Sequence, residues 1–230
     1  MPPEAVFFTG QLVGLVNLLA LRTCWPWDCE SQQSCNMEVM RGNMAERAQE
    51  KDDRVIEYRD LEEAELNMEL FGSFNRRQVV TDCWRRENGQ WVIRHAPFID
   101  DWSTEDYRFL IQCLKDTITA GGFVHGAFAE GRLKGFVAVL PEIFGGENRY
   151  VDLASIHVSQ DMRGKGIGTG LFLKAKEWAQ QRGAGKLYIS AHSAVESQAF
   201  YRKMGCVEAK QYLQKHVEEE PFDVQLELEL

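Results

Sequence analysis

A glycine-rich stretch, RGKGIGTG at residues 163–170, constrains the fold of this chain more than any other feature. It follows an apolar segment with strand character and precedes a segment, residues 169–182, with apolar side chains at helical spacing. Glycines let the backbone turn so that consecutive N–H groups face one anion. A helix that begins there adds its positive dipole end. The stretch therefore predicts a strand–turn–helix unit that binds phosphate groups, with Arg163 and Lys165 adding positive charge.

Two common nucleotide-binding motifs do not fit this stretch. A Walker loop ends in Gly-Lys-Ser/Thr, whereas Lys165 is followed by Gly166. A Rossmann fingerprint lies early in its domain and has an acid about twenty residues later, whereas the next strand here ends in SAHS at residues 190–193. A glycine turn that binds no ligand stays open as the alternative.

The order of apolar segments indicates an α/β (α+β) fold, because strand runs mixed with covering helices pack as layers around a sheet. We expect helices at residues 61–71, 104–119, 169–182 and 195–204. We expect strands at residues 55–59, 79–94 (two strands), 123–129, 133–140, 150–158, 187–191, 207–213 and 223–230. In the last of these, the apolar side chains of residues 224–230 alternate and fall on one face.

Several boundaries carry local signals. Asn88-Gly89 predicts a tight hairpin turn between the two strands of residues 79–94. Ser103 or Thr104 is expected to cap the helix that follows, and Gly205 to end the helix of residues 195–204.

The first 53 residues are predicted to be an N-terminal extension and linker, peripheral or poorly ordered, ahead of one domain at residues 54–230. The apolar run from Val6 to Leu21 is shorter than the roughly 20 residues of a membrane helix. It also lacks the positive start of a signal peptide. A signal peptide or anchor is therefore the less favoured interpretation.

Charge and cysteine content limit the classes of partner. The net charge of −9 argues against nucleic acid and anionic membranes and favours a cationic ligand. The six cysteines form no C-x-x-C pair and no zinc-type cluster. We therefore expect free thiols, a cytoplasmic location and no metal.

Two motifs in order resemble the GNAT N-acetyltransferase superfamily. Its Arg/Gln-x-x-Gly-x-Gly/Ala signature is matched by Arg163, Gly166 and Gly168. Its Ala-x-x-Phe-Tyr-x-x-x-Gly-Phe-like block is present as SQAFYRKMGC at residues 197–206, with Tyr201 at the expected position. A helix and a strand join the two motifs, and the resemblance covers residues 54–230.

The sequence departs from the family pattern in three places. Ser193-Ala194 stands where many members carry an asparagine near the coenzyme A arm, and Cys206 replaces the last phenylalanine of the second motif. Residues 79–102 form a longer region than minimal members have. Variation there usually concerns the acceptor substrate.

The resemblance implies a mixed, mostly antiparallel central sheet with splayed middle strands and helices on both faces. Acetyl-CoA, the implied co-substrate, would enter the splay with its pyrophosphate on the N–H groups of residues 163–169 and its pantetheine arm along residues 156–158. The cofactor-binding residues implied are Ile156, His157, Val158, Arg163, Gly164, Lys165, Gly166, Ile167, Gly168, Thr169, Ser197 and Tyr201.

The catalytic residues expected from the resemblance are Tyr201 and Asp152. Tyr201 would donate a proton or a hydrogen bond to the leaving thiolate, and otherwise packs against the coenzyme A arm. Asp152 stands where the family often has a glutamate and would deprotonate the amine through water, unless it is only a strand-end acid. Glu142 and Asp100 are further candidates, while His157 and His192 are less favoured.

An acidic and aromatic run precedes the second predicted helix. Two acids beside an aromatic ring can cradle a cation, so we expect a substrate site formed by Asp100, Asp101 and Trp102, with Glu142 on a neighbouring loop. The alternative is a loop that only caps the helix.

These inferences predict an N-acetyltransferase that moves the acetyl group of acetyl-CoA directly to a primary amine in a ternary complex. A small cationic acceptor, such as an antibiotic, polyamine or amino acid, is favoured over a protein or peptide amine. A non-catalytic acyl-CoA-binding regulatory module is the alternative. A homodimer that pairs the apolar last strand across its interface stays open.

Overall fold

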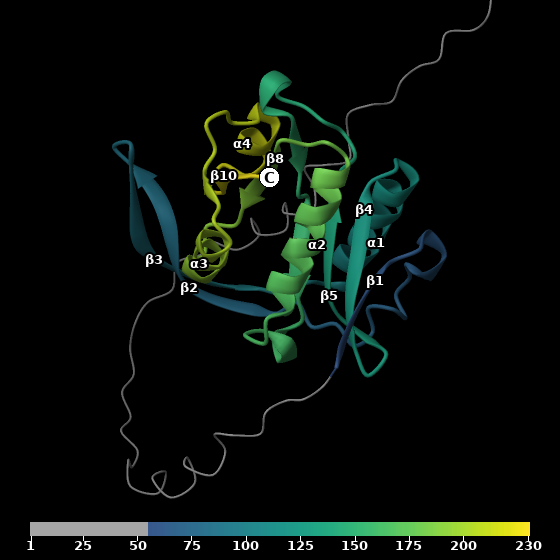
Figure 1. Ribbon diagram of the computed structural model, residues 1–230. Helices are drawn as coiled ribbons and strands as arrows, with labels where there is room; N and C mark the ends of the chain where they lie inside the picture. Colours follow the sequence, from purple (N-terminus) through teal and green to yellow (C-terminus); the bar gives the residue numbers. More distant parts are fainter. Residues whose placement is uncertain (1–54) are drawn as a thin grey trace, which may run out of the picture.

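The computed structural model describes residues 55–230, which form two four-stranded sheets, a separate hairpin and four α-helices (Figure 1). The mixed α and β composition and the helix-covered sheets confirm the predicted fold class. The extension predicted for residues 1–53, including its apolar run, lies outside the described residues.

The first sheet is antiparallel throughout, in the order β1-β4-β5-β7. Its strands are β1 (Ile56–Asp60), β4 (Phe123–Ala129), β5 (Arg132–Val139) and β7 (Ser155–Val158). Helix α2 (Ile167–Gln181) packs on one face and α1 (Thr104–Thr119) on the other. Both faces are therefore apolar, which explains why β4 and β5 are almost continuously buried.

The second sheet has the order β6-β8-β10-β9. Its strands are β6 (Tyr150–Asp152), β8 (Lys186–Ala191), β9 (Val207–Glu208) and β10 (Val224–Glu229). Only β6 and β8 run parallel. Helix α3 (Val195–Lys203) follows β8, and α4 (Gln214–Glu219) lies between β9 and β10.

The two sheets separate between β6 and β7. The sequence predicted one strand over residues 150–158, but pairing stops after the N–H of Leu153 bonds the carbonyl of Tyr188 at 2.9 Å. Beyond this point β7 pairs only with β5, so its other edge is without a strand partner in the described part of the chain. This break creates the splay between the middle strands.

The third unit is a hairpin of β2 (Gln78–Glu87) and β3 (Gln90–Asp100), which lies beside α3 in Figure 1. Its turn is at Asn88-Gly89, as predicted; both residues have positive φ, 50° and 79°, as a type I′ turn requires. Near its middle, Cys83 bridges to Ala194, and the N–H of Trp84 donates to the carbonyl of Ser193 at 2.8 Å. These contacts hold the middle of β2 against the segment that leads into α3.

Besides the single strand predicted over residues 150–158, two predicted elements are wrong and one helix was not predicted. Residues 61–71 form turns and one short 3₁₀ helix, Glu63–Glu65, because the buried Leu61, Leu66 and Phe71 recur every five residues rather than at helical spacing. The strand predicted at residues 207–213 is only Val207–Glu208, and α4 was not predicted.

The predicted start of the helix at residues 104–119 agrees with the structure, whereas the second hairpin strand, predicted to end at Arg94, runs to Asp100. Helix α1 has Ser103 as its N-cap, with Asp106 completing a capping box.

The three cysteines of the described residues, Cys83, Cys113 and Cys206, are free, as expected. No helix within residues 55–230 combines the length and hydropathy that a membrane crossing needs.

Candidate active site

The glycine-rich stretch forms the entrance to helix α2. Gly164 and Gly166 have φ of 79° and 85°, a conformation that side chains rarely adopt, and Gly166 is the N-cap. The first helical hydrogen bond runs from the N–H of Gly170 to the carbonyl of Gly166, at 3.0 Å. The N–H groups of residues 167–169 consequently have no backbone partner among the described residues and face the helix start.

A cavity of 400 Å³ opens at this helix end. It is lined by most of the residues that the sequence predicted for the cofactor, and it extends along α3: Ile156, Val158, Arg163, Gly164, Gly166, Ile167, Gly168, Thr169, Ser197 and Tyr201. His157 lines a neighbouring cavity instead. Lys165 lines neither cavity; its Nζ lies 3.6 Å from the sulfur of Met162.

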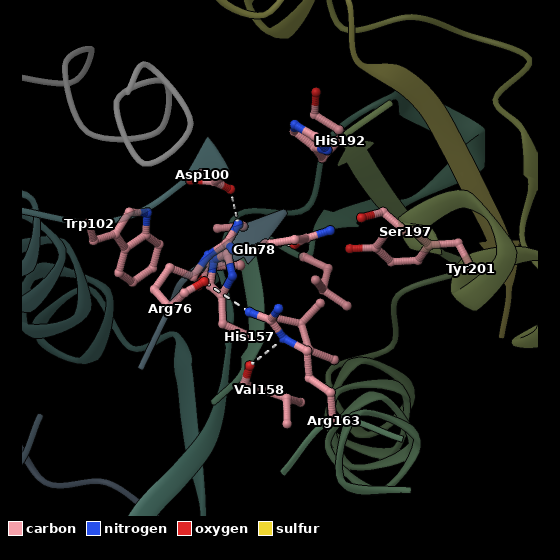
Figure 2. Close-up of a pocket in the computed structure, with 15 residues that line it drawn as sticks. Arg76, Gln78, Asp100, Trp102, His157, Val158, Arg163, His192, Ser197 and Tyr201 are labelled. Atoms are coloured by element: carbon pink, nitrogen blue, oxygen red, sulfur yellow. Dashed lines mark hydrogen bonds and ion pairs between the residues drawn. The ribbon is translucent and has the colours of Figure 1, made fainter. Parts of the chain in front are cut away.

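Arg163 has contacts that the sequence did not predict. Its Nε donates to the carbonyl of Val158 at 3.1 Å and its Nη2 to the carbonyl of Arg76 at 2.9 Å (Figure 2). Its N–H bonds the carbonyl of Gln160 at 3.4 Å, so this amide is already paired within the protein. Arg163 therefore ties the glycine-rich turn to β7 and to the segment that leads into the hairpin.

A second cavity, of 140 Å³, lies in the splay itself (Figure 2). Its walls come from residues 153–158, from Ser190 and His192 at the end of β8, from α3, and from the open end of the hairpin, where β2 begins and β3 ends. It shares with the larger cavity the lining residues Gln78, Ile156, Val158, Arg163, Ser197 and Tyr201. One path therefore leads from the glycine-rich turn to the gap between the sheets.

Tyr201 lines both cavities, and Figure 2 shows it beside Ser197. The side chain is buried, and burial, with Cys206 and Asp223 nearby, raises the pKa of its phenol far above the usual value. The phenol therefore stays neutral and can donate a hydrogen bond into the cavity.

Asp152, expected as the general base, lies at the end of β6 and lines neither cavity. Its Oδ2 is 2.7 Å from Nε2 of His216 in α4, and its buried Oδ1 has no partner within the described chain. Burial lowers the pKa of His216, but the hydrogen bond with Asp152 outweighs it and the pKa is raised. The pair thus favours a carboxylate facing an imidazolium, and the catalytic role of Asp152 stays a prediction.

The predicted substrate residues are only partly together. Asp100 and Trp102 line the smaller cavity, whereas Asp101 and Glu142 are exposed and line neither cavity. Arg76, which the sequence did not single out, forms an ion pair with Asp100 and lies over the Trp102 ring, 5.2 Å from its centroid. The protein's own guanidinium therefore occupies the place expected for the substrate's cation.

The two histidines of the cavity are neutral. Burial, together with the charges of Arg76 and Arg163, holds the pKa of His157 well below its usual value. Burial lowers the pKa of His192 to about 4. Nδ1 of His192 accepts the N–H of Ala194 at 3.2 Å, so the proton of the neutral ring is on Nε2.

Sequence reasoning also missed an acidic turn between α4 and β10. Glu219, Glu220 and Asp223 gather there, close to Ser190 in the cavity wall. Burial, reinforced by its acidic neighbours, raises the pKa of Glu220 to about 8, and burial raises that of Asp223 to about 7. The run EEEPFD at residues 218–223 is the only sequence signal for this turn.

Known proteins share part of this chain's sequence or its fold. Streptothricin acetyltransferase of Streptomyces lavendulae is 38% identical over 79 residues, which are 34% of this chain and 40% of that protein. The match therefore spans less than half the length of that relative.

Two crystal structures share the fold over 76% of this chain. Nourseothricin acetyltransferase has a TM-score of 0.55 at 19% identity over 98% of its length. A putative streptothricin acetyltransferase from Bacillus anthracis, in complex with acetyl coenzyme A, has a TM-score of 0.58 at 15% identity over 99% of its length.

The family model described as the acetyltransferase (GNAT) family matches residues 82–206, from the hairpin to the end of the second motif. The resemblance of the two motifs is thereby confirmed, and the chain belongs to the acetyltransferase (GNAT) family.

Proposed function

We propose that this protein is an acetyl-CoA-dependent N-acetyltransferase that acetylates a primary amine of a small cationic molecule. One observation carries the proposal: the cavity at the α2 N-terminus and the cavity in the splay share lining residues up to Tyr201. A pyrophosphate at the first and a thioester at the second fit the two ends of one coenzyme A molecule.

The helix end supplies the anion site. The N–H groups of residues 167–169 and the α2 dipole attract the pyrophosphate without any metal. The unpaired edge of β7 then offers backbone groups to the amides of the pantetheine arm, which would add to the sheet like a strand. An N–H on this edge is our candidate for holding the thioester carbonyl and the oxyanion that forms from it.

The chemistry proposed is direct attack by the amine on the thioester carbon in a ternary complex. Holding both reactants in one cavity supplies the proximity that the step needs. Tyr201 faces the cavity as a neutral phenol and would donate a hydrogen bond to the departing thiolate.

A cationic acceptor is supported by the net charge of the chain, which is −9. A net negative charge raises the local concentration of cations. The streptothricin acetyltransferase relative supports streptothricin as the first acceptor to test.

The test combines acetyl-CoA binding with thiol release. We expect acetyl-CoA to raise the melting temperature, and streptothricin, spermidine or lysine to release coenzyme A saturably. Gly166→Glu should abolish both effects, because a carboxylate at the helix start repels phosphate and a side chain at φ of 85° strains the turn.

Gly131→Glu is the matched control, because Gly131 also has positive φ, 71°, and open space around it, but lies in the β4–β5 turn. This variant should bind acetyl-CoA and release thiol like the wild type. Failure of coenzyme A to bind the wild type would overturn the proposal. Binding without transfer to any amine would favour a regulatory acyl-CoA-binding module instead.

A further inference from the structure

The cavity-wall groups described so far do not show which side chain takes the proton from the substrate's amine. The carboxylate of Asp100 is paired with Arg76. The pKa of His157 is far too low for a base at neutral pH, and Nε2 of His192 already carries its proton. A primary ammonium cannot attack a thioester, so another group in contact with the cavity must take its proton.

A row of polar side chains on the second sheet leads to the cavity. The register of β10 against β8 places Gln225 opposite Ser190. The Oη of Tyr188 donates to Oε1 of Gln225 at 2.7 Å, and Nε2 of Gln225 donates to Oγ of Ser190 at 2.9 Å. Ser190 lines the cavity, and its Oγ lies 3.3 Å from Oδ2 of Asp223.

The direction of each hydrogen bond in this row follows from the bond at Tyr188, the end of the row furthest from the cavity. The backbone N–H of Leu213 donates to Oη of Tyr188 at 2.8 Å, so the phenol proton must point to Gln225. The side-chain oxygen of Gln225 is then the acceptor and its NH₂ group the donor to Ser190. Ser190 therefore directs its own proton at Asp223 and keeps one lone pair for a ligand.

Charged groups from three elements face Asp223. His216 of α4 and Arg85 of β2 lower its pKa, Tyr201 of α3 lies close enough to be affected by its charge, and Glu220 precedes it in the turn. Burial opposes the positive groups and raises the pKa of Asp223 to about 7. A group with this pKa exchanges a proton readily at neutral pH.

We propose that Ser190 and Asp223 form the relay that deprotonates the acceptor's ammonium group. Ser190 is the catalytic residue that touches the amine, and Asp223 takes up the proton behind it. The inference rests on the proposed function and names the base of that same reaction, with a cationic primary amine as the acceptor.

The step balances in protons and electrons. An N–H bond of the ammonium breaks and its proton bonds Oγ of Ser190, while the original Ser190 proton moves to Oδ2 of Asp223. The freed lone pair attacks the thioester carbon, and the C–S bond then breaks. The second nitrogen proton ends on the coenzyme A thiolate beside Tyr201, and Asp223 returns its proton to solvent.

The experiment compares the wild type with Asp223→Asn, Ser190→Ala and the double variant, using acetyl-CoA and streptothricin. We expect kcat of the wild type to rise with pH through about 7, the pKa of Asp223. Asp223→Asn should lower kcat by about 10²–10⁴-fold and remove this rise. The double variant should be no slower than the slower single variant, because the two residues act as one unit.

Methoxyamine separates a base from a structural residue. Its amine is uncharged at neutral pH and needs no initial deprotonation. Asp223→Asn should therefore transfer acetyl to methoxyamine at nearly the wild-type rate. An equal loss with methoxyamine and streptothricin would mean that Asp223 only maintains the shape of the site, and would overturn the relay.

Glu229→Gln is the matched control, since Glu229 is an exposed acid at the far end of β10, the strand that Asp223 precedes, and lies outside the row. It should retain the wild-type kcat and pH profile. Coenzyme A affinity, measured by calorimetry, should be unchanged in all variants. A wild type that fails to bind coenzyme A or to transfer acetyl refutes the proposed function itself, whereas an active Asp223→Asn enzyme with an unchanged pH profile refutes only the relay.

Discussion

Nη2 of Arg163 donates to the backbone carbonyl of Arg76 at 2.9 Å, across a separation of 87 residues in the sequence. The same guanidinium bonds the carbonyl of Val158 at 3.1 Å. The Arg163 side chain thus joins the glycine-rich turn to β7 and to the backbone of Arg76. The side chain of Arg76 in turn pairs with Asp100. The proposed coenzyme A end and the proposed acceptor end of the site share this connection.

Arg163→Met should therefore impair both ends of the site. The two carbonyls lose their donors, which should lower the free energy of unfolding by about 1–3 kcal/mol. KM should rise for acetyl-CoA and for streptothricin alike. Urea unfolding and steady-state kinetics measure the two effects. Arg182→Met, at the exposed end of α2, should change neither. A rise in KM for acetyl-CoA alone would show that Arg163 serves only the phosphate groups.

Tyr201→Phe should lower kcat by about 10²–10⁴-fold and leave KM for acetyl-CoA nearly unchanged. The ring that packs in the cavity is retained, and only the hydroxyl proposed as donor to the thiolate is lost. Tyr212→Phe, which removes an exposed hydroxyl bonded to Glu208, is the control and should leave kcat unchanged. A Tyr201→Phe enzyme with wild-type kcat would reduce this residue to packing against coenzyme A.

The ion pair between Asp152 and His216 should make the free energy of unfolding depend on pH. The pKa of His216 is raised in the folded protein. The ion pair therefore contributes fully to the free energy of unfolding at pH values below the unfolded pKa of about 6.5. It is lost as the pH rises through the higher folded pKa. The difference in unfolding free energy between wild type and His216→Gln should thus be larger at low than at high pH. Urea titrations on both sides of this range measure it, and a constant difference would contradict the ion pair.

Asp152→Asn should destabilise the fold by about 3–5 kcal/mol, because it leaves a buried charged partner. Unfolding in urea at neutral pH measures this loss. The exposed Asp82, which faces His95 at the surface, supplies a control in Asp82→Asn, and this variant should cost little. If Asp152 is the base instead, its variant should retain stability and lose the rise of kcat with pH.

Local signals explain what the sequence predicted well. The glycine-rich turn, the Asn88-Gly89 hairpin turn and the Ser103 cap depend on residues that are neighbours in the chain. Their backbone geometry is determined within a few residues, so a single sequence suffices to place them.

The parts that were missed depend on contacts between distant segments. Arg76 meets Asp100 only because the hairpin between them folds back, and Ser190 meets Asp223 only through the register of β8 against β10. Helix α4 is too short to be stable by itself and packs through His216 on Asp152. The polar residues Gln225 and Glu227 of the last strand alternate with its apolar residues, yet both are buried, where Gln225 bonds Tyr188 and Glu227 bonds Lys186.

Glu220 should destabilise the folded protein as the pH rises. Burial raises its folded pKa to about 8, above an unfolded value of about 4.3, so the folded state binds more protons between these values. Stability must fall with pH over this interval. Glu220→Gln imitates the protonated acid and should melt at the wild-type temperature at pH 4 but at a higher temperature at pH 8.5. Scanning calorimetry at both pH values measures the difference, with the exposed Glu218→Gln as control. A higher melting temperature at both pH values would assign the gain to packing, since only the charged carboxylate carries the cost of burial.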